Sequence, residues 1–310
     1  MLSSLAGRSV NPSGRVVIVL CAIGAGCGGE AVSLGDSRPP LYHFGTPRLL
    51  AELDTAFANE NPTLTADLLE LCFNSNRDAS NSDIWIARRE STQAAFNPPE
   101  RVDAASSPLF ETSPAISLDG LSLFFGSDRP GGLGDLDIWR STRATRSSAW
   151  SVPEDLVPLN SPSKDLPRPT GQGDLVMPLS SDRDNLGAYQ TFLAARPGAG
   201  GTFGLPAAIP ELTFADRTTV DAFLSADGLT LFYTSAPTTL GAKPDLYVSW
   251  RKSTAQPFSV VASLDDLNTA ADERDPWLSP DGTVFFFTSD RSGLLQIYTA
   301  AASRGPSAGR

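Results

Sequence analysis

The sequence has very little of the chemistry that most metal sites and nucleophilic enzymes require. Its 310 residues include one histidine, three cysteines and two methionines. A zinc site takes several Cys or His ligands, and Ser-His or Cys-His catalysis takes a histidine beside its nucleophile. We therefore expect no metal site and no cofactor.

Basic residues are in the minority, at 24 Lys and Arg against 35 Asp and Glu, which gives a formal net charge of −11. A chain of this charge repels a phosphate backbone and no local run of Lys or Arg compensates, so nucleic acid is not expected as a partner. No apolar run is long enough to span a membrane. Hydrophobic residues still make up 41% of the chain, which is enough to build a core.

The beginning of the chain has the organisation of a bacterial export signal. Arg8 and Arg15 precede an apolar run that ends in small residues before Cys27. This ending resembles a lipobox, which implies a lipoprotein signal peptide over residues 1–27, lipidation of Cys27, and a membrane link through the lipid alone. The implied location is the bacterial cell envelope, at the outer membrane or on the periplasmic side. The alternative is an ordinary signal peptide in which Cys27 has no role.

The rest of the chain is dominated by internal repetition. Residues 28–40 show no period and are expected to be a flexible tether. Three later segments, 117–129, 225–235 and 279–291, are copies of one unit, and two degenerate copies keep the same register. Taking the hairpin position of each unit as its reference position gives residues 67, 119, 173, 227 and 281. Five copies with a period near 54 residues predict a repeat architecture.

Each unit divides into four short strands. An Asp-Gly pair between two apolar runs indicates a type I′ hairpin, in which both residues take positive φ. These pairs are Asp119-Gly120, Asp227-Gly228 and Asp281-Gly282. The third strand begins at an acid such as Asp137 or Asp245. The fourth begins at an aromatic residue that Pro often follows, which suits an outer edge strand.

Four-stranded units in series without helices predict a β-propeller. The segment 44–47 copies the start of a fourth strand but precedes the first full unit, and the last unit stops after three strands. One blade is therefore closed by an N-terminal outer strand. We expect an all-β fold, a five-bladed propeller of four-stranded blades over residues 41–301, with a disordered tail at 302–310.

The Ser-Pro-Asp-Gly segment at 279–293 and the Ser-Asp-Arg segment at 127–139 resemble the WD-repeat-like family of TolB-type propellers, found in bacterial envelope proteins and lipoproteins. The resemblance covers most of residues 60–301. It implies a binding scaffold, whose partner here would be an envelope protein or a glycan. The TolB propeller has six blades and a separate N-terminal domain, neither of which is found here, so its particular partners are not carried over.

The propeller topology assigns the charged residues to one face. Loops from strand four to strand one, and from strand two to strand three, share the loop face, whereas the Asp-Gly turns share the hairpin face. Acids recur at the start of strand one, and Arg168 breaks the repeat because other units have Pro or Ala there. The expected ligand site at the channel mouth comprises Glu111, Asp165, Arg168, Asp221, Glu273 and Asp275.

A structural role competes with ligand binding for several of these groups. Repetition favours blade building for the Ser-Asp-Arg arginines, Arg129 and Arg291 among them, and for the strand-three acids Asp137 and Asp245, each Arg pairing with an acid of its own blade. The acids before strand one leave both roles open. Phe223 and Trp277 either stack on a sugar or pack between blades.

Two functions follow from these observations. The preferred one is a lipid-anchored, non-catalytic scaffold that binds a protein or glycan at its acidic loop face. The alternative is a glycoside hydrolase, because five-bladed propellers include glycosidases that use carboxylates in the central funnel. Since the acids recur by blade and no singular pair stands out, we expect no catalytic residue.

Overall fold

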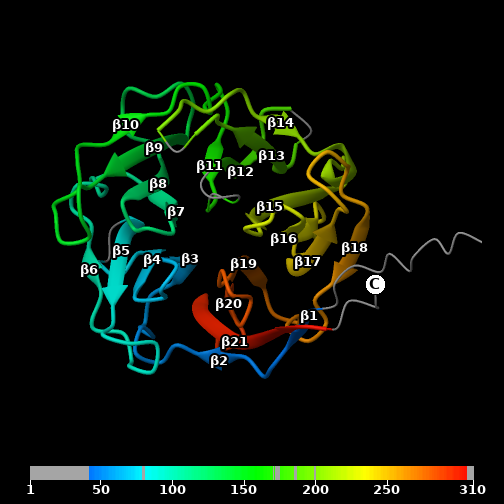
Figure 1. Cartoon of the computed structure of the whole chain (residues 1–310), viewed down its shortest axis with the longest axis horizontal. Helices are drawn as coiled ribbons and strands as arrows, with labels where there is room; N and C mark the ends of the chain where they lie inside the picture. The colour runs from blue at the N-terminus through cyan, green and yellow to red at the C-terminus, as the bar shows by residue number, and fades with distance from the viewer. Residues whose placement is uncertain are drawn as a thin grey trace, which may run out of the picture. The chain divides into compact units, whose positions relative to one another are not determined.

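The computed structural model describes residues 42–78, 81–169, 171, 175–184, 187–198 and 200–305. The predicted export signal with Cys27, the tether and the end of the tail lie outside these residues. Five antiparallel sheets stand in a ring (Figure 1). Each blade contacts the next around the ring, and β19 (Glu273–Leu278) contacts β3 (Asn59–Leu64), which closes it. The predicted five-bladed propeller is confirmed.

The blades are numbered here in chain order, each from its innermost strand outward. Their strands are β3–β6 (Asn59–Leu64, Glu70–Ser75, Asp83–Arg88, Glu100–Arg101), β7–β10 (Glu111–Ile116, Ser122–Ser127, Asp137–Thr142, Glu154–Asp155), β11–β14 (Asp165–Pro167, Val176–Ser181, Gln190–Ala195, Ala207–Ala208), β15–β18 (Arg217–Leu224, Thr230–Pro237, Asp245–Trp250, Val260–Ser263), and β19–β21 (Glu273–Leu278, Val284–Ser289, Gln296–Arg304) with β1 (Tyr42–Phe44) and β2 (Arg48–Leu49). One 3₁₀ turn, η1 (Pro210–Leu212), is the only helical element among the described residues. The described residues contain no helix that is long and apolar enough to cross a membrane.

Both N-terminal strands complete blade 5. β1 and β2 pair antiparallel with β21, so the first described strands of the chain lie on the last (Figure 1). Tyr42 is opposite Arg304 and Leu49 is opposite Tyr298. Because β1 supplies a partner, β21 continues to Arg304, beyond the boundary expected at residue 301.

The Asp-Gly hairpins form, but their turn type differs from the prediction. Only the glycine takes positive φ, at 76° in Gly120, 69° in Gly228 and 72° in Gly282. Asp119 instead accepts hydrogen bonds at Oδ1 from Ser117 Oγ (2.6 Å) and Leu121 N (2.8 Å). These side-chain bonds stabilise a longer turn that ends in a left-handed glycine, in place of type I′.

Aromatic side chains fill the spaces between blades. The rings of Phe223 in blade 4 and Trp277 in blade 5 lie 6.0 Å apart, and Trp277 is fully buried. This contact favours packing between blades over sugar stacking for the ring faces that the two residues turn toward each other. Cys72 is also buried, as its alignment with Phe residues of other units predicts, and burial raises the pKa of its thiol.

Candidate functional site

The loop-face arginines build the blades. Arg129 donates from Nε to Ser127 Oγ (3.0 Å) and from Nη2 to Glu111 Oε1 (3.1 Å) and to the Ala105 carbonyl. The same set recurs with Arg183, whose carboxylate is Asp165, and with Arg291, whose carboxylate is Glu273. The carboxylates of all three acids are 0% exposed. Of the two roles that the sequence left open for them, their contacts are those of blade building.

The expected pairing of these arginines with the strand-three acids is wrong. The strand-one acid takes the guanidinium, and Asp137 Oδ2 accepts the backbone N–H of Gly134 (3.0 Å) instead. Asp245 begins β17, and burial raises the pKa of both Asp137 and Asp245. The sequence argument placed the right residue types in the blade but chose the wrong acid.

A second set of residues lies two positions further along each innermost strand. The residue six before the reference position takes positive φ in four blades: Asn61 (58°), Ser113 (50°), Asp221 (55°) and Asp275 (59°). In each of these strands the register shifts at this point, as in a β-bulge. Bulges re-aim side chains, and Asn and Asp tolerate this conformation better than most residues.

Arg168 of blade 3 brings three of these residues together. Its Nη1 donates to Asn61 Oδ1 and lies 3.8 Å from Asp221 Oδ1 and 3.6 Å from Asp275 Oδ1. Asn61 N also donates to Asp275 Oδ2 at 3.1 Å. The Arg168 side chain is 1% exposed, and its Nε and Nη2 have no partner among the described atoms. One guanidinium thus joins blades 1, 3, 4 and 5 at the propeller axis.

Two carboxyl groups at this centre hold protons near neutral pH. Burial first, and then repulsion from Asp275, raise the pKa of Glu60 and of Asp221 to about 7. Arg274 opposes this effect and lies 4.0 Å from Glu60 Oε2. The Glu60 and Asp221 side chains remain 26% and 15% exposed, so solvent reaches both.

A polar pocket of about 310 Å³ borders Glu60 on the loop face. Its other lining residues come from blades 1 and 2: Ala58, Asn74, Asn76, Asn81, Ser82, Phe110 and Thr112. Phe110 is 40% exposed, so it presents an apolar surface beside several amide and hydroxyl groups. Amides, hydroxyls and one exposed ring are the groups that carbohydrate hydroxyls and sugar faces contact.

The predicted site residues therefore divide into two groups. Arg168, Asp221 and Asp275 meet at the axis, whereas Glu111, Asp165 and Glu273 are buried within separate blades. Sequence reasoning missed three residues of the centre, Glu60, Asn61 and Arg274. The signal was present, because Glu60 and Arg274 are the charged residues at a repeat position that Thr112, Leu166 and Val220 fill elsewhere.

Among the described residues, no group of three or more His, Cys, Asp or Glu side chains is arranged to hold a metal ion. The basic groups of the centre are Arg168 and Arg274, against the carboxylates of Glu60, Asp221 and Asp275. The excess of acid keeps a proton in the cluster, because like charges at short range cannot all ionise. The site can therefore both donate and accept a proton.

Solved structures of similar fold include a TolB-like protein and glycoside hydrolases. A TolB-like protein of Agrobacterium tumefaciens matches with a TM-score of 0.50 and 14% identity, over 84% of this chain and 85% of that one. The α-L-arabinofuranosidase PaAbf62A of Podospora anserina, solved with cellotriose, matches with a TM-score of 0.55 and 8% identity, over 80% and 91%. A family 117 glycoside hydrolase of Zobellia galactanivorans matches with a TM-score of 0.50 and 13% identity, over 85% and 90%.

These likenesses extend to the fold alone, and they confirm a TolB-like propeller at that level. No protein-family model and no curated protein sequence matches the chain. The glycoside hydrolases correct the expectation that the protein is not an enzyme, because chains with hydrolytic sites share this arrangement of blades over most of their length.

Proposed function

We propose that the protein is a glycoside hydrolase whose reacting carboxyl groups are Glu60 and Asp221. The observation that carries this proposal is the pKa of about 7 for both groups, at a solvent-reached centre on the propeller axis. Glycoside hydrolysis uses two carboxyl groups, one protonated to assist the leaving oxygen and one ionised to activate water or attack the sugar. Two carboxyl groups whose pKa values are about 7 supply both forms near neutral pH.

The remaining charged groups of the centre support these roles. The Asp275 side chain is 2% exposed and accepts a hydrogen bond from Asn61 N. Its repulsion raises the pKa of Asp221. Arg168 lies within 4 Å of Asp221 and Asp275 and fixes their positions. Its two unpartnered nitrogens, Nε and Nη2, are buried and leave donors for a bound water.

The pocket beside Glu60 suits a sugar unit. Its volume of about 310 Å³ is at the lower end of ligand pockets, which span about 300–1,000 Å³. Glu60 is the carboxyl group that lines it, so we assign the general-acid role to Glu60 and the base or nucleophile role to Asp221. Phe110 offers the apolar face against which a sugar ring packs.

The test is hydrolysis of a panel of 4-nitrophenyl glycosides, including the α-L-arabinofuranoside, and of plant and algal oligosaccharides. Glu60→Gln and Asp221→Asn each remove a titrating group while keeping its shape. We expect each substitution to lower kcat by about 10²-fold or more, because general acid–base catalysis contributes about 10²–10⁴-fold.

Matched controls separate chemistry from folding. Asp119→Asn makes the same substitution in a hairpin on the opposite face, and it is expected to leave turnover unchanged. Turnover that survives both Glu60→Gln and Asp221→Asn, with the variants folded by circular dichroism, contradicts the assignment. Binding of a glycan without any turnover contradicts the proposed activity.

A further inference from the structure

An arginine clamp repeats on the hairpin face of four blades. The residue six after the first residue of strand three is Arg89, Arg143, Arg196 or Arg251, and each guanidinium stacks on an aromatic residue two to four positions before strand four. The distances to the ring centroids are 4.4 Å (Phe96), 4.4 Å (Trp150), 4.7 Å (Phe203) and 4.5 Å (Phe258). This geometry is a cation–π contact in every case.

Three of the clamps also hold the hairpin of their own blade. The Nε of Arg89, Arg143 and Arg251 donates to the carbonyl of Leu68 (2.8 Å), Gly120 (2.7 Å) and Gly228 (2.8 Å), respectively. The clamp therefore fills the space between the hairpin and the outer strand with a positive charge.

Blade 5 lacks the clamp. Its equivalent residue is Ala302, because Ala302 N bonds to Thr283 O just as Arg143 N bonds to Leu121 O and Arg251 N to Leu229 O. A methyl group thus replaces a guanidinium beside the hairpin of Asp281 and Gly282. The backbone of this hairpin and the Asp281 carboxylate therefore receive no guanidinium from residue 302.

A pocket of about 410 Å³ opens where the clamp is missing. Ala302, Ser303 and Arg304 of β21 line it, together with the hairpins of blades 4 and 5. Phe223 contributes aromatic surface, and the fully buried Trp277 packs against it. The indole N–H of Trp277 has no partner among the described atoms. The pocket therefore places aromatic surface beside the hairpin of blade 5.

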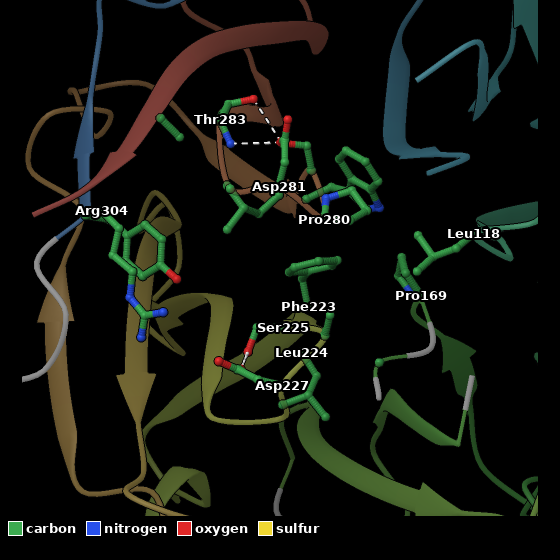
Figure 2. A pocket seen from close by; sticks show the side chains of 18 of the residues that line it. Leu118, Pro169, Phe223, Leu224, Ser225, Asp227, Pro280, Asp281, Thr283 and Arg304 are labelled. Atoms are coloured by element: carbon green, nitrogen blue, oxygen red, sulfur yellow. Dashed lines mark hydrogen bonds between the residues drawn. The ribbon is translucent and has the colours of Figure 1, made fainter. Parts of the chain in front are cut away.

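The charges of the lining favour a cation. Asp227 and Asp281 flank Phe223 from the two hairpins, against the single basic group of Arg304 (Figure 2). Hydrogen bonds from Ser279 and Thr283 lower the pKa of Asp281, so it is charged at neutral pH. Oδ1 of each carboxylate accepts hydrogen bonds from the serine of its own hairpin and from a backbone N–H. No hydrogen bond among the described atoms reaches Oδ2.

We propose that this pocket binds a small amphipathic cation, with an aromatic or aliphatic body and one guanidinium, amidinium or ammonium group. The body packs on Phe223, and the cation takes the position that the arginine clamp holds in other blades. The carboxylate of Asp281 and the hairpin backbone receive its hydrogen bonds. A volume of about 410 Å³ holds a small molecule rather than a folded partner.

Benzamidine is the probe, because it joins a flat ring to an amidinium. Benzamide has nearly the same shape without the charge, and benzoate reverses the charge. We expect calorimetric or tryptophan-fluorescence titration to show benzamidine binding at least about tenfold tighter than benzamide, and no binding of benzoate. Equal affinity for benzamidine and benzamide overturns the proposal.

Two variants locate the binding. Ala302→Arg restores the clamp and is expected to abolish benzamidine binding while the fold is kept. Asp281→Asn preserves the hairpin acceptor and is expected to weaken binding about tenfold, whereas Asp119→Asn, in the hairpin of blade 2, leaves it unchanged. If Ala302→Arg does not fold, the comparison of Asp281→Asn with Asp119→Asn decides. Unchanged affinity in Asp281→Asn contradicts the site, whatever the outcome of the glycoside assays on the loop face.

Discussion

Asp221 and Asp275 show how one backbone feature changes the role of a residue. In a regular strand, successive side chains point to opposite faces of the sheet. The bulge and the positive φ instead bring both carboxylates to Arg168, together with Asn61 from another blade. A repeated backbone conformation is filled by different side chains in each blade, so a five-fold frame carries a site without five-fold symmetry.

The raised pKa of Asp221 makes a stability prediction. A carboxyl group whose pKa rises from near 4 to about 7 on folding stabilises the fold below pH 4 relative to higher pH, and this contribution is lost as pH rises through 7. Asp221→Asn removes the penalty, so the variant should exceed the wild type by about 1–3 kcal/mol at pH 8 and match it near pH 4. Denaturant unfolding at both pH values measures the difference.

The control for this prediction is Asp227→Asn, which makes the same change on an exposed hairpin of the same blade. Its stability should follow the pH dependence of the wild type. A variant Asp221→Asn that is less stable at pH 8 than at pH 4, relative to the wild type, would show that Asp221 is charged and favourably paired in the folded protein.

At the scale of the element, the unit that stabilises blades 2, 3 and 5 is a buried ion pair on the loop face. Glu111 accepts from Ser107 N (2.9 Å), Ser107 Oγ (2.5 Å), Ser127 Oγ (3.0 Å) and Arg129. It therefore joins the loop before strand one to the end of strand two. The same contacts recur in other blades, as expected of a group that builds the repeat rather than binds a ligand.

Breaking this unit should be costly. Glu111→Ala leaves Arg129 without its carboxylate and Ser107 without an acceptor, and loss of one partner of a buried pair costs about 3–5 kcal/mol. The exposed Asp135, in the next loop of the same blade, provides a control, since Asp135→Asn should change stability by less than about 0.5 kcal/mol. Thermal unfolding of both variants tests this, and a similar Tm for the two would contradict the structural role.

The sequence predicted elements better than contacts, for a physical reason. Spacing and turn residues are local, so Gly120, Gly228 and Gly282 reveal the hairpins and the segment 44–47 reveals the closing strand. The partner of an arginine depends on geometry between elements, and so the choice of Asp137 instead of Glu111 for Arg129 failed. Glu60 escaped notice because its importance arises only once Asp275 and Arg274 lie beside it.

At the scale of the whole molecule, the two faces of the ring carry different candidate sites. The loop face carries the carboxyl cluster of Glu60 and Asp221, and the hairpin face carries the pocket beside Ala302. Both are departures from the repeat, one by charged residues at an otherwise uncharged position and one by a missing arginine. Repetition therefore explains the stability of the propeller, whereas its exceptions mark the candidate sites.

The predicted export signal leads to a prediction for the whole chain. We propose that Cys27 is lipidated and tethers the propeller to a membrane of the cell envelope, since one or two acyl chains anchor a protein without a spanning segment. Cys27→Ala should move the protein from the membrane to the soluble fraction of cells. The buried Cys72→Ala serves as the control, and an unchanged distribution of Cys27→Ala would contradict the anchor.

The most direct test of the central proposal is the pH dependence of kcat/KM on a glycoside that the wild type hydrolyses. The pKa values of about 7 for Glu60 and Asp221 predict a bell-shaped profile with its maximum near pH 7, because both groups are protonated below it and both ionised above it. Glu60→Gln should abolish the bell along with about 10²-fold or more of the rate. A wild-type profile that stays flat from pH 5 to 9, or the absence of turnover on every glycoside in the panel, would contradict the account.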